Sequence, residues 1–339
     1  MKNNPQELFH TVLGRARESV RPGLDLCQRH IVAVAEAAPG RLRPRLEHIM
    51  SRKGKRVRAT MMFLLAATGK NDSPAEIDRQ ARTAASLEML HLASLVHDDV
   101  IDESELRRGL FTANAEWGNK MAVLVGDYVL SKSMELAVVE PDRRIPAILS
   151  AASSQLVAGE VLEIDLAGKL DASIEEYEAV IEGKTASLFE ACGKCGAILA
   201  GHDEALVEAC GELGRHFGLT FQIVDDLLDF GVGAGDLGKA KFSDLANGLV
   251  TLPLLHYFSK CTPEEHLAMT ALLKRAAAED LAAAEAVKNA LASKGSFDHA
   301  METGMAHMIG AMKILDLLPQ GNAHALLSEV CGAMIHRSN

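Results

Sequence analysis

The chain has 339 residues, of which 48% are hydrophobic and 24% are charged, as in ordinary soluble globular proteins. Acidic residues outnumber basic residues by 46 to 35, which gives a formal net charge of −11. A nucleic-acid-binding protein usually carries a basic surface, so this charge argues against a nucleic-acid partner and suits a protein that binds cations.

Residues 1–20 are polar and helix-like, without the apolar core of a secretory signal. No apolar run approaches the roughly 20 residues that a helix needs to span a bilayer. The six cysteines are scattered, so a disulfide framework is not expected. Cys192 and Cys195 have C-x-x-C spacing but lack the further ligands of a zinc site, and we expect them to pack between helices. These features predict a cytoplasmic protein with no transmembrane segment.

Helix-forming residues dominate the rest of the chain. Four segments rich in Ala, Leu, Met and Glu predict long helices, and alternating β-branched runs are almost absent. The longest irregular stretch covers residues 231–248. No interdomain linker and no repeat of fixed period is visible, so we expect residues 1–339 to form a single all-α domain, a helical bundle with a buried core. In chain order, the four segments are residues 58–69, 81–102, 122–139 and 147–168.

Three aspartates stand together at the end of the second segment: Asp98, Asp99 and Asp102, in the order D-D-x-x-D. Residues four apart share one face of a helix, so the carboxylates of Asp98 and Asp102 repel each other unless solvent or a cation offsets the repulsion. The apolar sequence "HLASLV" precedes them, and carboxylates in an apolar helix need a compensating charge. If this motif stood alone, a solvated acidic helix end would be an equally good interpretation.

The same spacing returns 127 residues later, at Asp225, Asp226 and Asp229, again after an apolar run. Mg²⁺ commonly takes one or two carboxylates and completes its shell with water and phosphate oxygens, so two facing motifs could hold several Mg²⁺ ions around a diphosphate. Cationic side chains would match the remaining phosphate charge, since arginine offers a bidentate fork to phosphate oxygens. The candidates are Lys55, Arg58, Arg107, Arg108 and Lys184.

The chain resembles the trans-isoprenyl diphosphate synthases, also called polyprenyl synthetases. The motifs follow the family's order over most of the chain from about residue 50 to residue 255. The resemblance implies an all-α bundle of the isoprenoid synthase type around a deep central cavity, a homodimer, and Mg²⁺ as cofactor. The matching segments are "GKRVRA" (54–59), "EMLHLASLVHDDVIDESELRRG" (88–109), "GNKMAVLVGDYVLSKS" (118–133), "GKTASLF" (183–189), "FQIVDDLLDF" (221–230) and "GKAKFSDLANGLVTLPLL" (238–255).

The resemblance also implies roles for individual residues. Asp98 and Asp102 would bind Mg²⁺ directly, with Asp99 in support. Asp225 would be the foremost direct ligand of the second motif, beside Asp226 and Asp229. The residues that would hold the allylic diphosphate are Arg107, Lys184, Thr185, Gln222 and Lys239. The residues that would bind isopentenyl diphosphate are Lys55, Arg58, His91 and Arg108.

Two positions depart from the family pattern. Ala59 stands where the family commonly has proline, and we expect only a local change in the turn. Leu249 stands where the family usually carries a lysine that helps to neutralise the allylic diphosphate. The second departure removes one cation from the expected binding site and leaves the aspartates untouched.

The implied reaction is the head-to-tail (1′-4) condensation of isopentenyl diphosphate with an allylic diphosphate. Mg²⁺ and cationic side chains would stabilise the departing diphosphate, and the double bond of isopentenyl diphosphate would attack the resulting allylic cation. Apolar helices beneath the aspartates would keep water away from that cation. No protein nucleophile is required, and none is visible in the sequence.

Two other functions remain open from the sequence. A terpene cyclase uses related chemistry, but it usually replaces the second D-D-x-x-D with a motif that contains Asn, Ser or Thr and Glu. A non-catalytic partner subunit of a heteromeric synthase tends to lose its aspartate motifs, whereas both motifs are intact here.

The residues before the first motif bear on product length. In the family, aromatic residues four and five positions before this motif stop the product early, and this chain has Ser94 and Ala93 there. We therefore predict a product longer than C20, in the range C30 to C50, with a farnesyl or geranylgeranyl diphosphate synthase as the alternative. A helical wheel places Ala93 almost opposite the aspartate face, so the floor of the cavity could instead be set by Leu90 or Met89.

Overall fold

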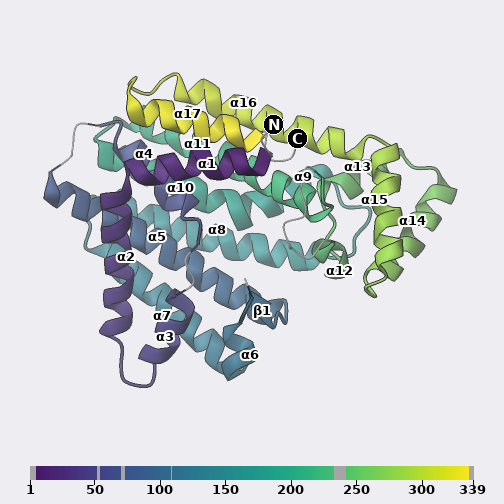
Figure 1. The fold of residues 1–339 in the computed structure, drawn as a ribbon, viewed down its shortest axis with the longest axis horizontal. Coiled ribbons are helices and arrows are strands. Elements are labelled where there is room, and N and C mark those ends of the chain that lie inside the picture. Colours follow the sequence, from purple (N-terminus) through teal and green to yellow (C-terminus); the bar gives the residue numbers. More distant parts are fainter. Residues whose placement is uncertain (1–4, 52–53, 70–72, 108, 233–241, 336–339) are drawn as a thin grey trace.

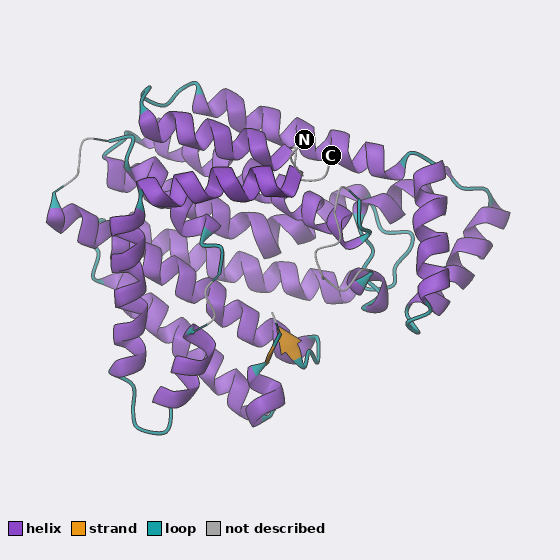
Figure 2. Ribbon diagram, viewed as in Figure 1, coloured by secondary structure: helices purple, strands orange, loops and turns teal. Residues whose placement is uncertain are grey.

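A computed structural model describes residues 5–51, 54–69, 73–107, 109–232 and 242–335 of the chain (Figure 1). Helices make up nearly all of the regular structure in these ranges, which confirms the predicted all-α fold (Figure 2). The exception is a small antiparallel hairpin of two strands, β1 (Leu106–Arg107) and β2 (Leu110–Phe111).

The N-terminal helices wrap one side of the bundle. Helix α1 packs against the C-terminal helix α17, so the two ends of the described chain lie close together (Figure 1). Helix α4 is apolar almost all round and lies in the core, as expected for a helix that lacks a polar face. The bounds of these helices are α1 Pro5–Ser19, α2 Arg21–Glu36, α3 Arg43–Met50, α4 Val57–Ala66 and α17 Asn322–Ile335.

Five longer helices form the centre of the molecule. Local sequence signals start two of them, because Ser73 caps α5 through the Glu76 backbone N–H and Asp203 caps α11 through that of Leu206. The Ser86 hydroxyl of α5 donates to the Ser133 carbonyl of α7, which ties two apolar helices together inside the core. The bounds are α5 Pro74–Ile101, α7 Asn119–Val138, α8 Arg144–Leu166, α10 Ser187–Ala200 and α11 Glu204–Asp229.

The remaining elements complete the bundle. A capping box of Thr262 and Glu265 starts α14, which pairs with α15 at one end of the molecule (Figure 1). One turn, η1, is a π-helix, a form that often marks functional sites. The bounds are α6 Ala113–Trp117, α9 Ile174–Ile181, η1 Glu182–Ala186, α12 Ser243–Ala246, α13 Leu252–Lys260, α14 Pro263–Ala276, α15 Leu281–Ser293 and α16 Ser296–Leu315.

The C-x-x-C pair lies in the core, as predicted. Cys192 and Cys195 on α10 are both fully buried. Burial raises the pKa of both thiols, so they are kept in the unreactive protonated form. The spacing reflects packing between helices.

Helix α8 qualifies the prediction that the chain has no transmembrane segment. Among the described residues, it is the one helix with the length and apolar composition needed to cross a membrane, and 33% of its most apolar stretch is buried. Core helices of soluble proteins have the same properties, so this is weak evidence for a span. Its Glu160 and Glu163 line cavities of the bundle and pair with Lys184 of the π-helical turn η1.

Candidate active site

Both aspartate motifs lie at the C-terminal end of a long helix. Asp98 and Asp99 are in the last turn of α5, and Asp102 is its C-cap residue. The second motif ends α11, whose last residue is Asp229. The negative end of the helix dipole disfavours carboxylates at these positions. The local cost to the fold indicates that the aspartates serve a ligand.

One cavity of about 420 Å³ lies between the two motifs. Asp98 and Asp102 line it from α5, and Asp225 lines it from α11. Arg108 and Lys239 lie outside the described residues. The other predicted binding residues all line this cavity, and they are Lys55, Arg58, His91, Arg107, Lys184, Thr185 and Gln222.

The first motif is open to the cavity but electrostatically strained. Burial, followed by the nearby charge of Glu160, raises the pKa of Asp98 to about 7, although Lys184 and Arg107 act in the opposite direction. Asp99 is itself buried and accepts a hydrogen bond of 2.6 Å from Arg107 Nε. Asp99 therefore holds a cationic side chain at the cavity edge, which agrees with the supporting role implied by the resemblance.

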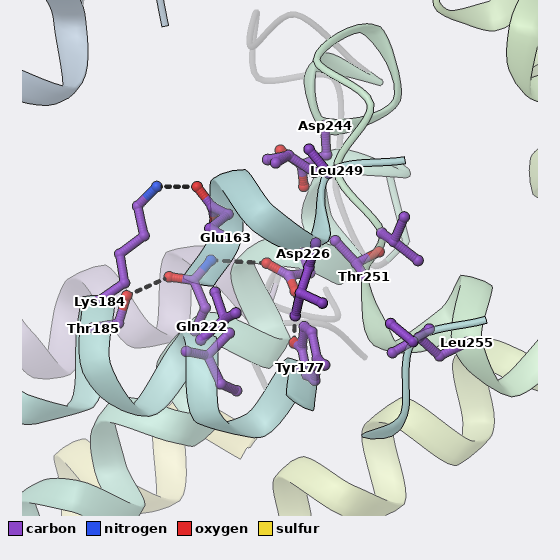
Figure 3. Close-up of a pocket in the computed structure, with 16 residues that line it drawn as sticks. Glu163, Tyr177, Lys184, Thr185, Gln222, Asp226, Asp244, Leu249, Thr251 and Leu255 are labelled. Atoms are coloured by element: carbon purple, nitrogen blue, oxygen red, sulfur yellow. Dashed lines mark hydrogen bonds and ion pairs between the residues drawn. The ribbon is translucent and has the colours of Figure 1, made fainter. Parts of the chain in front are cut away.

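Asp226 is enclosed within the second motif. Its Oδ2 accepts a 2.6 Å hydrogen bond from the Tyr177 hydroxyl, and its Oδ1 accepts a 2.8 Å bond from Gln222 Nε2 (Figure 3). The Thr185 hydroxyl donates to Gln222 Oε1 at 2.8 Å. Burial raises the pKa of Asp226 to about 7, although the two donors lower it. The side chain is engaged by protein groups.

Asp229 fixes the segment that follows the second motif. Its Oδ1 accepts hydrogen bonds from the Ser243 backbone N–H at 3.1 Å and from the Ser243 hydroxyl at 2.5 Å. Its Oδ2 accepts a bond of 3.2 Å from the Asp244 backbone N–H. Asp98 and Asp102 therefore both line the central cavity, whereas only Asp225 of the pair Asp225 and Asp229 does so.

Lys184 lies between two carboxylates that the sequence interpretation did not single out. It forms an ion pair of 3.0 Å with Glu160. Figure 3 shows its second, close ion pair, with Glu163. Burial lowers the pKa of Lys184, but the two glutamates outweigh it and leave the pKa above its usual range. The sequence did contain a signal for this pairing. Two glutamates stand three residues apart in the apolar helix α8, and buried carboxylates require a partner.

Two glycines bring Lys184 into place. Gly159 of α8 and Gly183 of η1 approach so closely that a Cβ atom on Gly159 would lie 2.5 Å from the Lys184 backbone nitrogen. A Cβ atom on Gly183 would lie 2.8 Å from the Gly159 Cα atom. The close crossing of α8 and η1 therefore depends on the absence of side chains at both positions.

Arg58 and His91 also line the central cavity. Arg58 Nη1 lies 3.1 Å from His91 Nε2, and its guanidinium stacks over the Phe189 ring at 4.5 Å. Arg56, which the sequence interpretation passed over, supports this part of the cavity. Its backbone is left-handed, with φ of 53°, and its guanidinium donates to Glu88 at 2.7 Å. Glu88 also accepts the Ala59 backbone N–H at 3.2 Å.

A second cavity, of about 350 Å³, begins beside Asp98 and runs between α5, α7 and α8. Ala93 and Ser94 both line it. The helical wheel placed Ala93 almost opposite the aspartates, so the wheel alone did not predict that Ala93 reaches this cavity. The cavity is broader than one face of α5 because α7 and α8 supply its other sides. Leu90 lines this cavity as well, whereas Met89 lines the central cavity.

Leu249 lines a third, smaller cavity of about 160 Å³ beside the second motif (Figure 3). Lys184, Asp226 and Asp244 contribute its polar groups. The leucine is partly buried, and apolar side chains of α8 and α9 surround the same space. The departure from the family pattern therefore lies beside Asp226, in a cavity next to the central one.

The donor set fits hard divalent cations that are completed by a ligand. Within the described ranges, no group of three or more His, Cys, Asp or Glu side chains is arranged to hold a metal by itself. Three carboxylates nevertheless face one cavity, namely those of Asp98, Asp102 and Asp225. This arrangement suits Mg²⁺, which takes few carboxylates and retains water and phosphate oxygens.

Comparisons with known proteins agree with this geometry. A family model described as polyprenyl synthetase matches residues 40–291. The chain is 35% identical over 272 residues to octaprenyl diphosphate synthase from Escherichia coli (strain K12), which covers 80% of this chain and 82% of that protein. It is 33% identical over 283 residues to heptaprenyl diphosphate synthase component 2 from Geobacillus stearothermophilus, covering 84% of this chain and 86% of that protein.

A solved structure has the same fold. The polyprenyl synthase from Caulobacter crescentus CB15, complexed with calcium and isoprenyl diphosphate, matches with a TM-score of 0.84 and 31% sequence identity. The match covers 97% of this chain and 98% of that chain.

Proposed function

We propose how the cavities divide the reaction, from the premise that the chain belongs to the polyprenyl synthetase family. It is a trans-polyprenyl diphosphate synthase, a prenyltransferase that joins isopentenyl diphosphate to an allylic diphosphate, and the two relatives named above are an octaprenyl diphosphate synthase and a component of a heptaprenyl diphosphate synthase. The fold is the all-α isoprenoid synthase bundle. The roles of individual residues, the metal, the product length and the assembly are the parts that we propose.

The central cavity would hold both diphosphates, with divalent cations on the aspartate side. Asp98, Asp102 and Asp225 would hold Mg²⁺, and the ions would stabilise negative charge on the departing diphosphate. We assign Asp99, Asp226 and Asp229 to supporting these ligands, because protein groups already engage their carboxylates.

The side chains of this chain would position the two substrates. The allylic diphosphate would be bound on the aspartate side by Arg107, Lys184, Thr185 and Gln222, and Lys239 would also contribute. Isopentenyl diphosphate would be bound by Lys55, Arg58 and His91, together with Arg108. Positioned cations stabilise charge most strongly where water is excluded. The apolar second cavity would receive the hydrocarbon chain and keep water away from it.

The observation that carries this proposal is the convergence of three carboxylates and several cationic side chains on one cavity that leads into an apolar one. The test is to assay the purified chain alone with Mg²⁺, an allylic primer and labelled isopentenyl diphosphate. We expect polyprenyl diphosphate as the product. A chain that is active only after a second, different protein is added would instead be a partner subunit, and a cyclic hydrocarbon product would identify a terpene cyclase.

For product length, we propose chains longer than C20, in the range C30 to C50. The cavity beside Asp98 has small residues, Ala93 and Ser94, at its entrance. An aromatic ring at Ala93 would obstruct it, so Ala93→Phe should shorten the product, whereas Ala93→Ser should leave it unchanged. Chromatography of the dephosphorylated products measures this, and a wild-type product of C15 or C20 would contradict the proposal.

For assembly, we propose a cytoplasmic homodimer in which a second copy covers α7 and α8. Leu124 of α7 and Val157, Val161 and Ile164 of α8 are each more than half exposed. Val157, Val161 and Ile164 also line the second cavity, so a partner on this face would complete its wall. Light scattering of the purified chain should give twice the monomer mass, and a monomer would rule the dimer out.

A further inference from the structure

Tyr177 occupies an unusual position beside the second motif. It lies on α9, is almost fully buried, and packs its ring among apolar residues of α9 and α11. Its hydroxyl donates a 2.6 Å hydrogen bond to Asp226 Oδ2 (Figure 3). A buried tyrosine hydroxyl needs a polar partner, and here that partner is a carboxylate of the metal-binding motif.

The hydrogen bonds that extend from Asp226 have a fixed direction. A carboxylate accepts hydrogen bonds, so the group of Gln222 that faces Asp226 must be its amino group, at 2.8 Å. The Gln222 oxygen is then turned the other way, and it accepts the Thr185 hydroxyl at 2.8 Å. The direction of each bond follows from the one before it, beginning at Asp226.

This chain of hydrogen bonds ends at the central cavity. Gln222 and Thr185 line that cavity as well as the smaller one, whereas Tyr177 lines only the smaller one. With both carboxylate oxygens occupied, Asp226 cannot rotate without losing a bond to a charged group, and Gln222 is held with it.

We propose that Tyr177 is a positioning residue for the allylic-diphosphate side of the site. It acts through Asp226, and it fixes the side-chain amide of Gln222 at the cavity wall. The inference rests on the proposed function, because it assigns the allylic diphosphate to that wall. Arg58 contacts His91 and Phe189, so we expect the binding of isopentenyl diphosphate by these residues not to depend on Tyr177.

The test is Tyr177→Phe, which removes the hydroxyl and keeps the ring in its apolar surroundings. Hydrogen bonds to charged groups are among the stronger ones, so we expect about a tenfold rise in KM for the allylic substrate with a fall in kcat. KM for isopentenyl diphosphate should stay within about twofold. By calorimetry, inorganic diphosphate with Mg²⁺ should bind about tenfold more weakly.

A matched control is Tyr257→Phe on α13, another buried tyrosine, which lies in a different apolar cluster. It should leave both KM values unchanged. If Tyr177→Phe moves neither KM, or moves both equally, Tyr177 has no positioning role. A wild-type chain that makes no product from the two diphosphates would overturn the proposed function instead.

A double-mutant cycle separates positioning from a general loss of stability. If Tyr177 acts through Gln222, adding Tyr177→Phe to Gln222→Leu should raise the allylic KM no further. Additive effects would contradict the proposal. If Tyr177→Phe does not fold, Asp226→Asn tests the same hydrogen bonds, because an asparagine side chain offers one acceptor oxygen where the carboxylate offers two. An unchanged KM for the allylic substrate in that variant would overturn the inference.

Discussion

The two D-D-x-x-D regions have the same spacing and the same place at the end of a helix, but opposite surroundings. In the first, Asp102 is exposed and Asp98 faces the central cavity. In the second, Asp226 and Asp229 are buried and accept hydrogen bonds from protein groups. Spacing alone therefore predicts where negative charge gathers, whereas the neighbouring elements decide which carboxylates remain available to a ligand.

This difference has a structural origin. A short hairpin follows the first motif, and its Arg107 engages only the middle aspartate. Side chains from three places converge on the second motif: Tyr177 from the earlier helix α9, Gln222 from the preceding turn of α11 itself, and Ser243 from the start of the later helix α12. The first motif thus presents two carboxylates to the central cavity, whereas the second presents one and uses the other two in hydrogen bonds to protein groups.

The strongest test of this comparison removes one cavity-lining carboxylate from each region. Asp98→Asn and Asp225→Asn should each lower kcat by about 10²–10³-fold or more, because each removes charge stabilisation at the departing diphosphate. Steady-state assays measure this, with the exposed Asp316→Asn on the far side as control. EDTA should abolish wild-type activity and Mg²⁺ should restore it. Full turnover in either variant would show that the two regions do not share the ions.

A second test uses stability. Asp229→Ala removes the acceptor for Ser243 and Asp244, which should cost about 1–2 kcal/mol and lower Tm by roughly 2–6 °C. Asp102→Ala removes a carboxylate from the unfavourable end of the α5 dipole, so its Tm should stay equal or rise slightly. Thermal unfolding of the metal-free variants decides, and an equal loss in both would remove the distinction between the regions.

A third test uses the pH dependence that burial of Asp98 creates. Its folded pKa of about 7 lies above the value for an unfolded chain, so the folded protein binds more protons between roughly pH 4 and 7. Stability must then fall as pH rises through that window and level off above it. The Asp98→Asn variant lacks this contribution to stability. Without metal, the Tm of the variant minus the Tm of the wild type should therefore increase by roughly 2 °C from pH 5 to pH 8.

Added Mg²⁺ supplies the control for this experiment. At pH 8 the ion should stabilise the wild type more than Asp98→Asn, because only the wild type offers the charged carboxylate. A difference in Tm that is constant from pH 5 to pH 8 would mean that Asp98 is not strained by burial.

The sequence predicted much of this site and missed its supports. The fold class followed from helical patterning, and the segment from His91 to Asp102 was placed correctly because both period and charge are local signals. Tyr177, Arg56 and Glu88 were missed because each acts through a partner 29 or more residues away in the chain, and no local pattern encodes such pairs.

The second motif shows the same limit. Helical periodicity placed Asp225 and Asp229 on one face, but it could not show that Ser243 would return to cover Asp229. Access to the second cavity was misjudged at Ala93 for a similar reason, since α7 and α8 widen the space beyond the face of α5. The local geometry of a helix can be predicted from its sequence, whereas the groups that cover one face of a helix come from segments that are distant in the chain.

The smallest expected effect concerns Leu249, beside the second region. Leu249→Lys would place an ammonium group in the cavity lined by Lys184, Asp226 and Asp244, near the allylic-diphosphate side. The added charge should lower KM for the allylic substrate by a few-fold, on the order of 1 kcal/mol or less for a partly exposed charge. KM for isopentenyl diphosphate should not change, because neither Arg58 nor His91 lines the cavity around Leu249. Leu249→Met is the control, since it keeps the position apolar. If the lysine variant changes neither KM, the carboxylate of Asp244 or Asp226 has paired with the new ammonium group. The aspartates of the second region other than Asp225 would then have a structural role.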